Sequence, residues 1–227
     1  MLCCPAAPPV LVLVSGPPGA GKSSLCARLS GFYGLVHLDK DELDEKVMPG
    51  KRDAEYRQNL EPLVLRDLLA SARDLLTQGE GCILDAPWTC ILHDRPELVQ
   101  EIQTICSHAN ALLLVFELGL STEVLYHRLL CRNLERDSPK LESSDSWRLF
   151  LSRDHVSEVV PLPHVPVDAE RDLEDVFEFC CSHLGELIAQ RKPHAPCADP
   201  VSSASVAFSD SVCAETATTR SASMDSL

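Results

Sequence analysis

The sequence predicts an α/β domain of three layers, in which helices cover both faces of a mainly parallel sheet. Short apolar runs at residues 10–14 and 112–116 are typical of strands buried on both faces. Stretches with helical periodicity alternate with such runs, and this alternation requires right-handed crossovers between parallel strands. At 227 residues the chain is long enough for one domain with a complete core and short for two.

The expected elements follow in order along the chain. Strands are expected at residues 10–14, 35–39, 82–84, 112–116 and 165–167. Helical patterns occupy residues 23–29, 54–78, 95–107, 122–134, 146–159 and 173–190. From residue 192 the composition changes to Ser, Ala, Thr and Pro, which predicts a disordered tail, with a phosphorylated regulatory segment as the alternative. We therefore expect a flexible N-terminus at residues 1–9, a folded domain at residues 10–191 and a disordered tail at residues 192–227.

Charge and cysteine usage restrict the possible partners and the compartment. The formal net charge of −14 repels the phosphate backbone of nucleic acid and anionic membrane surfaces, so a small-molecule partner is favoured. The eleven cysteines are odd in number and include no CxxC spacing, which indicates a reduced, cytosolic protein and not a disulfide scaffold. No stretch approaches the roughly 20 apolar residues that span a bilayer.

The strongest motif is the sequence GPPGAGKS at residues 16–23, which matches GxxxxGK[ST] between an expected strand and an expected helix. Glycines allow backbone N–H groups to close around a β-phosphate, and the following helix presents its positive end. This phosphate loop (P-loop) predicts a purine nucleoside triphosphate, with Lys22 at the β- and γ-phosphates and Ser23 on Mg²⁺. The expected donor-binding residues are Gly16, Pro17, Pro18, Gly19, Ala20, Gly21, Lys22, Ser23 and Ser24.

Carboxylates follow the second expected strand, in the segment DKDEL at residues 39–43. The carboxyl ends of parallel strands line the ligand crevice, so these side chains are placed to meet a substrate hydroxyl near the γ-phosphate. Asp41 is the first candidate for the catalytic base. Asp39 is the second, and it is also a candidate for acting on Mg²⁺ through water. The alternative is a solvated helix start with acidic residues at its N-terminus.

A further acidic residue, Asp85, ends the third expected strand in CILDAPW. Asp85 is a candidate for orienting the water of a metal ion or for binding substrate. Trp88, three residues later, is a candidate for an aromatic wall of the substrate site. An equally weighted alternative places Trp88 in the core, because Trp is usually largely buried.

Three arginines, Arg128, Arg132 and Arg136, recur every four residues and would share one face of a continuous helix. Such a face is suited to a lid that closes over a triphosphate and neutralises the charge that develops during transfer. Of the three, Arg128 is assigned to the substrate. The interspersed Glu135 and Asp137 leave an ordinary solvated face as the alternative.

Together these segments resemble the P-loop kinases grouped with polynucleotide 5′-kinase, zeta toxin, chloramphenicol phosphotransferase and gluconate kinase, which have an AAA-like ATP-binding domain. The resemblance covers residues 10–190 and is carried by the P-loop, LDKDEL, ILDAPW, and RNLER with Pro139 and Lys140. It implies a P-loop NTPase fold with a five-stranded, mainly parallel sheet and a helical, Arg-bearing lid. It also implies ATP and Mg²⁺ as cofactors, Asp41 as the base, and Arg132 and Arg136 on the donor phosphates.

One departure from this family concerns the acceptor. Members often carry a basic residue three positions after the base, where this chain has Asp44. In the polynucleotide kinases that residue helps to hold the acceptor's phosphate, so Asp44 disfavours a nucleic-acid acceptor. The expectation is an ATP-dependent kinase of a small hydroxylated molecule, working as a monomer or small homo-oligomer. The alternatives are a polynucleotide or nucleotide 5′-kinase, and a nucleotide-binding regulatory module with weak ATPase activity.

Overall fold

Five parallel strands form one sheet at the centre of the residues that the computed structural model describes, 7–49 and 55–190. The strands are β1 (Val10–Ser15), β2 (Val36–Asp39), β3 (Cys82–Asp85), β4 (Leu112–Gly119) and β5 (Val165–Asp168). Their order in the sheet is β2-β3-β1-β4-β5, and every neighbouring pair is parallel. The predicted five-stranded parallel sheet is therefore confirmed.

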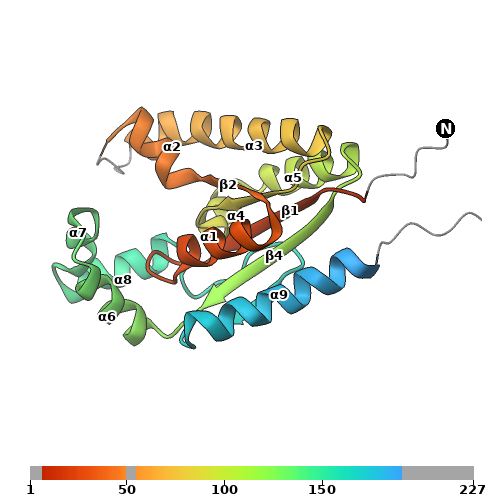
Figure 1. Ribbon diagram of the computed structural model, residues 1–227. Coiled ribbons are helices and arrows are strands. Elements are labelled where there is room, and N and C mark those ends of the chain that lie inside the picture. Colours follow the sequence, from red (N-terminus) through yellow and green to blue (C-terminus); the bar gives the residue numbers. More distant parts are fainter. Residues whose placement is uncertain (1–6, 50–54, 191–227) are drawn as a thin grey trace, which may run out of the picture. The chain divides into compact units, whose positions relative to one another are not determined.

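Helices lie on both faces of this sheet and at one end of it (Figure 1). The longer ones are α1 (Lys22–Tyr33), α3 (Glu61–Thr77), α5 (Glu97–His108), α6 (Thr122–Arg132), α8 (Ser144–Arg153) and α9 (Leu173–Gln190). The shorter ones are α2 (Lys40–Val47), α4 (Trp88–Asp94) and α7 (Ser138–Leu141), with a π-helical segment at Tyr56–Leu60 and a 3₁₀ turn at Glu135–Asp137. No helix in the described ranges is both long and apolar enough to span a bilayer.

The parallel register collects polar side chains at one edge of the sheet. Asp39 stands opposite Asp85 where β2 and β3 end. Ser15 stands opposite Glu117 in the pairing of β1 with β4. Because β1 lies between β3 and β4, these four residues form a row at the carboxyl edge, where ligands bind in open α/β sheets.

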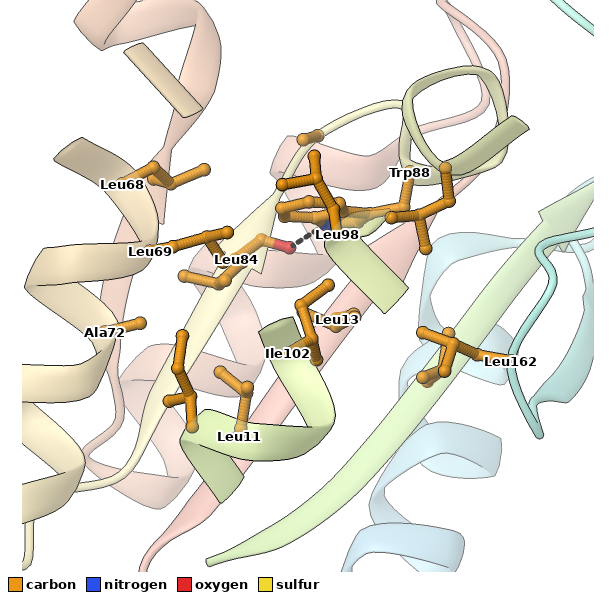
Figure 2. Close-up of a cluster of buried hydrophobic side chains, with 14 of the residues drawn as sticks. Leu11, Leu13, Leu68, Leu69, Ala72, Leu84, Trp88, Leu98, Ile102 and Leu162 are labelled. Carbon is orange, nitrogen blue, oxygen red and sulfur yellow. Dashed lines mark hydrogen bonds between the residues drawn. The ribbon is translucent and has the colours of Figure 1, made fainter. Parts of the chain in front are cut away.

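One apolar core lies between the sheet and helices α3, α4 and α5 (Figure 2). Trp88 is in this core with none of its surface exposed, and its indole N–H donates to the carbonyl of Leu84 at 3.1 Å. The structure thus corrects the assignment of Trp88 as a substrate-binding wall, since a fully buried ring presents no face to a ligand. This position removes the apolar ring from water, and the hydrogen bond to Leu84 gives the indole N–H, the only donor of the side chain, a partner.

The other long helices pack in two further apolar cores. Helices α1 and α9 cover the opposite face of the sheet, through Leu25 and Leu29 of α1 and Cys180 and Leu184 of α9. The segment from α6 to α8, which carries Arg128, Arg132 and Arg136 and is called the lid below, has a small core of its own, built from Leu125 and Leu129 of α6 and Phe150 of α8. The lid is therefore a packed helical subdomain and not an extended loop.

The helix that was predicted at residues 122–134 ends earlier because of one backbone conformation. Asn133 adopts the left-handed region with φ 45°, which stops α6 at Arg132. Arg136 consequently lies in the 3₁₀ turn. The inference that Arg128, Arg132 and Arg136 share one helix face is wrong for Arg136.

Other boundaries shift for local reasons. α8 begins at Ser144 because the hydroxyl of Ser143 caps it, accepting from the N–H of Ser146 at 3.0 Å. α4 was not predicted, because five of its seven residues are buried and its sequence has no polar face to mark a helical period. The predicted tail at residues 192–227 and most of the predicted flexible N-terminus at residues 1–9 lie outside the described residues.

We expect Trp88→Ala to lower the free energy of unfolding by about 3–5 kcal/mol, because it removes a large side chain from a close-packed core. Chemical denaturation followed by far-UV circular dichroism measures this loss. The control is Phe32→Ala, at a ring that is 67% exposed, which should cost about 1 kcal/mol or less. Equal losses for the two variants would contradict the core assignment.

Candidate active site

The P-loop connects β1 to α1. At each of its two ends the backbone has a positive φ angle that favours glycine. Gly16 has φ 135°, and a Cβ there would lie 2.6 Å from the carbonyl oxygen of Leu118. Gly21 has φ 97° and precedes α1 without any side-chain cap. The first N–H groups of α1 are therefore left for a ligand, and the positive end of the helix makes an anion the favoured one.

The Lys22 side chain folds back over its own loop. Its ammonium donates to the carbonyls of Gly16 at 2.9 Å and Pro17 at 3.1 Å. Burial lowers the pKa of Lys22, although the nearby carboxylates of Asp85 and Asp41 oppose this effect. A phosphate is a stronger partner for an ammonium than a carbonyl, so these two hydrogen bonds are ones that a bound triphosphate can replace.

A cavity of about 1460 Å³ opens beside the P-loop. Its lining brings together most of the site residues that the sequence predicts: Ser23, Asp39, Asp41, Asp85, Arg132 and Arg136. These residues come from α1, the row of strand ends, the first turn of α2 and the lid. Their common position in one cavity is the geometric requirement for a donor site and an acceptor site that share a reacting centre.

Asp39 and Asp85 supply the carboxylates nearest the sheet. Asp39 caps α2 by accepting from the N–H of Asp41 at 2.8 Å, and burial, reinforced by Asp85, raises the pKa of Asp39. Asp85 is only 3% exposed, and its Oδ2 lies 3.6 Å from Nε2 of His37, beyond hydrogen-bond distance. The Asp85 carboxylate raises the pKa of His37.

The predicted donor set suits Mg²⁺. Oδ2 of Asp85 is buried and has no hydrogen-bond partner in the described part of the chain, an arrangement that is costly unless a cation is nearby. The exposed Ser23 hydroxyl lines the same cavity, as does the Asp39 carboxylate. Hydroxyl and carboxylate oxygens are the hard ligands that Mg²⁺ prefers. Ser23, with Asp85 and Asp39 acting directly or through water, is thus a fitting set of ligands.

Asp41 and Arg136 face one another across the cavity. The guanidinium of Arg136 lies 3.0 Å from Oδ2 of Asp41, and both side chains are partly exposed. The candidate base and a candidate donor-phosphate ligand are therefore in direct contact. This contact also ties the lid to the start of α2.

Arg132 is held differently from Arg136. Its Nε lies 2.5 Å from Oδ2 of Asp137, which is 1% exposed and also binds the ammonium of Lys140 at 2.7 Å. Burial alone would raise the pKa of Asp137, but the hydrogen bonds from Arg132 and Lys140 outweigh it and lower that pKa. Asp137, which the sequence left as one of two interspersed acids, thus joins the end of α6 to α7 within the lid.

Arg128 lies away from the large cavity. Its guanidinium donates to the backbone carbonyl of Ala169 at 2.7 Å and approaches that of Ala20 at 3.5 Å. It lines a separate hollow of about 150 Å³ that also borders Gly21 and Ser24. The structure therefore places Arg128 beside the donor loop and apart from Asp41 and Asp85.

A buried polar network behind α2 escaped the sequence analysis. The ammonium of Lys40 contacts Asp44 and Glu61, each at 2.9 Å, and the Tyr56 hydroxyl bonds to Asp44. Burial lowers the pKa of Lys40, but Glu61 and Asp44 outweigh it and raise the pKa. The spacing of four between Lys40 and Asp44 was a visible signal, whereas Glu61 comes from a separate helix. Asp44 therefore has a structural role here and is not directed at an acceptor.

A second missed group links β1, β4 and α4. The hydroxyl of Thr89 donates to Oε1 of Glu117 at 2.7 Å and lies 2.8 Å from the Ser15 hydroxyl. Burial raises the pKa of Glu117, whose Oε2 has no hydrogen-bond partner among the described residues. Glu117 lines the large cavity as well. Ser15 and Glu117 are at strand ends and Thr89 is at the start of a distant helix. No local sequence pattern therefore predicts that the three residues meet.

Comparisons with known proteins found a matching family model and related sequences. A protein-family model described as an AAA domain matches residues 11–153. Adenylate kinase from Synechococcus sp. is 33% identical over 183 residues, which are 73% of this chain and 93% of that relative.

Solved structures share the fold. A protein from Chloroflexus aurantiacus, provisionally described as a kinase, has a TM-score of 0.62 and 22% identity, covering 80% of this chain and 98% of its own. A gluconokinase from Sinorhizobium meliloti has a TM-score of 0.54 and 16% identity, covering 81% and 95%. Since the family model spans more than half of the chain and one kinase relative matches along nearly its whole length, the protein belongs to the AAA-domain family of P-loop kinases.

Proposed function

We propose that this protein is an ATP-dependent phosphotransferase that moves the γ-phosphoryl group of ATP to a hydroxyl group of a small molecule. The observation that carries the proposal is the meeting of Lys22, Asp41 and Arg136 in one cavity. A phosphate-binding lysine, a carboxylate and an exchangeable arginine are the parts that in-line phosphoryl transfer needs. The family membership supports the same reaction class.

The donor end of the cavity is formed by the P-loop. The free N–H groups at the start of α1 and the Lys22 ammonium bind the β- and γ-phosphates, and the hydrogen bonds from Lys22 to Gly16 and Pro17 are given up in exchange. Mg²⁺, when bound at Ser23, neutralises phosphate charge. The hollow beside Arg128 adjoins the same loop, so we assign Arg128 to the nucleoside half of the donor.

The transfer step uses Asp41 and Arg136 together. When a triphosphate binds, Arg136 leaves Asp41 for the phosphate oxygens, and the freed carboxylate accepts the proton of the acceptor hydroxyl. The hydroxyl oxygen forms the new P–O bond, the bond from the γ-phosphorus to the bridging oxygen breaks, and ADP departs. Asp41 is preferred over Asp39 as the base, because one oxygen of Asp39 is already committed to capping α2.

Among the residues that the structure describes, the cations of the acceptor end named here are already paired with carboxylates. Arg57 and Arg153 both contact Asp154, at 2.9 and 2.8 Å, and Lys40 contacts two carboxylates at 2.9 Å. An acceptor phosphate would have to displace these carboxylates, at the cost of leaving them without a partner. A hydroxyl compound without a phosphate avoids that cost, so this class of acceptor is favoured.

A second candidate is a nucleoside monophosphate kinase, because the relative from Synechococcus is an adenylate kinase. It would require basic residues for the acceptor phosphate beyond those that serve the donor. Arg153 is the most accessible of the paired cations, with 47% of its side chain exposed. The pairing described above makes this the weaker proposal.

A cytosolic setting remains part of the proposal. Every cysteine in the described residues is a free thiol, including the neighbours Cys180 and Cys181. Free thiols are the usual state in a reducing compartment. A monomer or small homo-oligomer is our expectation for the assembly.

We expect Lys22→Ala to weaken ATP binding by about 10- to 100-fold, because hydrogen bonds to charged groups contribute about 1.5–3 kcal/mol. Titration calorimetry with Mg²⁺ present measures the affinity, and thermal unfolding of the same samples verifies the fold. The matched control is Lys46→Ala, an exposed lysine on α2. Unchanged ATP affinity in Lys22→Ala would remove the P-loop assignment.

Asp41→Asn keeps the size of the side chain but cannot take a proton, so transfer should fall by about 10²- to 10⁴-fold. ATP affinity should persist or rise, because Arg136 loses a competing partner. Steady-state transfer and calorimetry on one preparation separate the two effects. Glu42→Gln, at the exposed neighbouring acid, is the control.

Two companion variants distinguish the roles at this pair. Arg136→Ala should lower transfer and, more weakly, ATP affinity, because it removes a phosphate ligand. Asp39→Asn should retain measurable transfer. If instead Asp39→Asn abolishes transfer while Asp41→Asn does not, Asp39 is the base.

An acceptor screen with γ-labelled ATP tests the substrate class. It should contain neutral polyols, amino alcohols, their phosphorylated counterparts and nucleoside monophosphates. We expect kcat/KM for an unphosphorylated acceptor to exceed that of its phosphorylated counterpart by at least about tenfold, a difference of about 1.4 kcal/mol. A preference for nucleoside monophosphates would establish the second candidate, and label released only as phosphate would indicate a regulatory ATPase.

A further inference from the structure

Two consecutive residues just after α8 join three elements at the acceptor end of the large cavity. Asp154 contacts Arg57 of the π-helical segment at 2.9 Å and Arg153 of α8 at 2.8 Å. His155 lies 3.2 Å from Asp94 at the end of α4, and both Asp154 and His155 line the cavity. His155 has no role in the transfer step described above.

His155 has a left-handed backbone conformation. Its φ is 51°, a value that is uncommon for residues other than glycine. Residues in this region persist where the surrounding contacts hold them, and they are concentrated at functional sites. The side-chain contacts of His155 thus help to hold the turn that separates it from Asp154.

Both ring nitrogens of His155 face carboxylates. Nδ1 lies 2.9 Å from Oε1 of Glu158, and Nε2 lies 3.2 Å from Oδ1 of Asp94. A carboxylate only accepts hydrogen bonds, so the two contacts are made together when each nitrogen carries a proton, which is the imidazolium form. Hydrogen bonding to Glu158, with a smaller effect of Asp94, raises the pKa of His155, although burial opposes this shift. The geometry and the pKa therefore agree on a charged ring.

The other charged and titratable groups around this ring come from α4 and from the residues next to it. His93 of α4 stacks on His155 with ring centroids 4.9 Å apart, and its Nδ1 lies 3.2 Å from the second carboxylate oxygen of Glu158. Two charged rings in a stack would repel each other, so a single imidazolium is favoured. Nε2 of His93 contacts the backbone carbonyl of Val159 at 3.0 Å, whereas both nitrogens of His155 face acids. The neighbouring Asp154 is balanced by its two arginines, so the charge belongs on His155.

We propose that protonated His155 is a positioning residue for the acceptor end, which holds the segment after α8 against α4 and thereby keeps Asp154 and its two arginines at the cavity wall. The inference rests on the proposed function in naming this wall as that of the acceptor. The contacts of His155 with Asp94 and Glu158, called the clasp below, do not depend on that assignment.

The clasp should depend on pH in both directions. The folded-state pKa of His155 is raised, so the clasp is fully present below the ordinary pKa of histidine and is lost as pH rises through the folded-state value. The contact with His155 lowers the folded-state pKa of Glu158, so the clasp is also lost as pH falls through that value. The clasp therefore holds between these two pKa values and opens as conditions become alkaline.

Proton NMR titration of the full chain tests the charge state. The ring resonances of His155 should titrate at higher pH than those of His127, an exposed histidine on α6. Asp94→Asn and Glu158→Gln keep hydrogen-bond acceptors of similar size but remove the charge. Each should lower the titration midpoint of His155 by about 0.2–0.7 pH unit, the effect of a partly exposed ion pair. His155→Asn identifies the resonances, because Asn tolerates the left-handed backbone.

Alkylation of Cys90 with iodoacetamide measures whether the cavity wall moves. Cys90 is 8% exposed, and its Sγ lies 3.9 Å from the Arg57 guanidinium and 3.9 Å from the carbonyl oxygen of Arg153. Below the titration midpoint of wild-type His155, His155→Asn should raise the labelling rate at Cys90 by about two- to fivefold. Above that midpoint the difference should vanish. Comparing the two proteins at each pH cancels the pH dependence of the thiol itself.

A second thiol separates local opening from global unfolding. Cys106 of α5 is 7% exposed and belongs to the core on the same face of the sheet. Its labelling rate should be equal in wild type and His155→Asn, because the clasp does not hold α5. Mass spectrometry of the labelled peptides measures both thiols in one sample.

Two outcomes would overturn the proposal. The first is a high-pH midpoint that remains in His155→Asn and disappears in His93→Gln, which would place the charge on His93. The second is equal labelling of Cys90 in wild type and His155→Asn at every pH, or a parallel rise at Cys106, which would leave His155 with a role in overall stability alone. Neither readout uses ATP or an acceptor, so failure of this inference is distinguishable from failure of the proposed function.

Discussion

The parallel register of the sheet is the constraint on which the site depends. Because all five strands run the same way, their carboxyl ends meet at one edge, and Ser15, Asp39, Asp85 and Glu117 form a row there. The P-loop leaves β1 at the middle of that edge, so any anion bound by the first turn of α1 lies over the row of acids. Phosphate and carboxylate would repel each other in this position. We propose that Lys22, together with a cation when one is bound, would offset this repulsion.

The distribution of counter-charges divides the large cavity into two halves. Near the P-loop, and within the described residues, the ammonium of Lys22 bonds to two backbone carbonyls and the guanidinium of Arg136 contacts one partly exposed acid, so both are available to phosphate. Towards α3 and α8, Lys40 and Arg57 are committed to carboxylates in buried or half-buried pairs. A charge that is already paired loses that partner when a ligand takes it, so the second half offers less to an anion. Under the proposed function, the specificity for the donor and that for the acceptor would both follow from this one pattern of ion pairs.

Local sequence patterns predicted the strands and the P-loop, because an apolar run ending in glycines is a property of neighbouring residues. Local patterns failed where the position of a residue depends on contacts between segments that are distant in sequence. Lys40 and Glu61 meet only after two helices pack, and the buried position of Trp88 follows from the covering of the sheet by α4. The helical face assigned to Arg136 failed for a different reason, since Asn133 ends α6 with a single left-handed residue that propensity does not foresee.

The two lid arginines, Arg132 and Arg136, differ in the free energy that is needed to separate each from its carboxylate partner. Arg132 is bonded to Asp137, which is 1% exposed, and breaking a buried pair by removing one partner costs about 3–5 kcal/mol. The contact of Arg136 with Asp41 has partners that are 33% and 48% exposed, and pairs of that kind contribute only about 0–1 kcal/mol. Under the proposed function, binding of a triphosphate would therefore recruit Arg136 at little cost while Arg132 keeps its buried partner. Of the two lid arginines, Arg132 would stay on Asp137, and Arg136 would leave the candidate base when a donor binds.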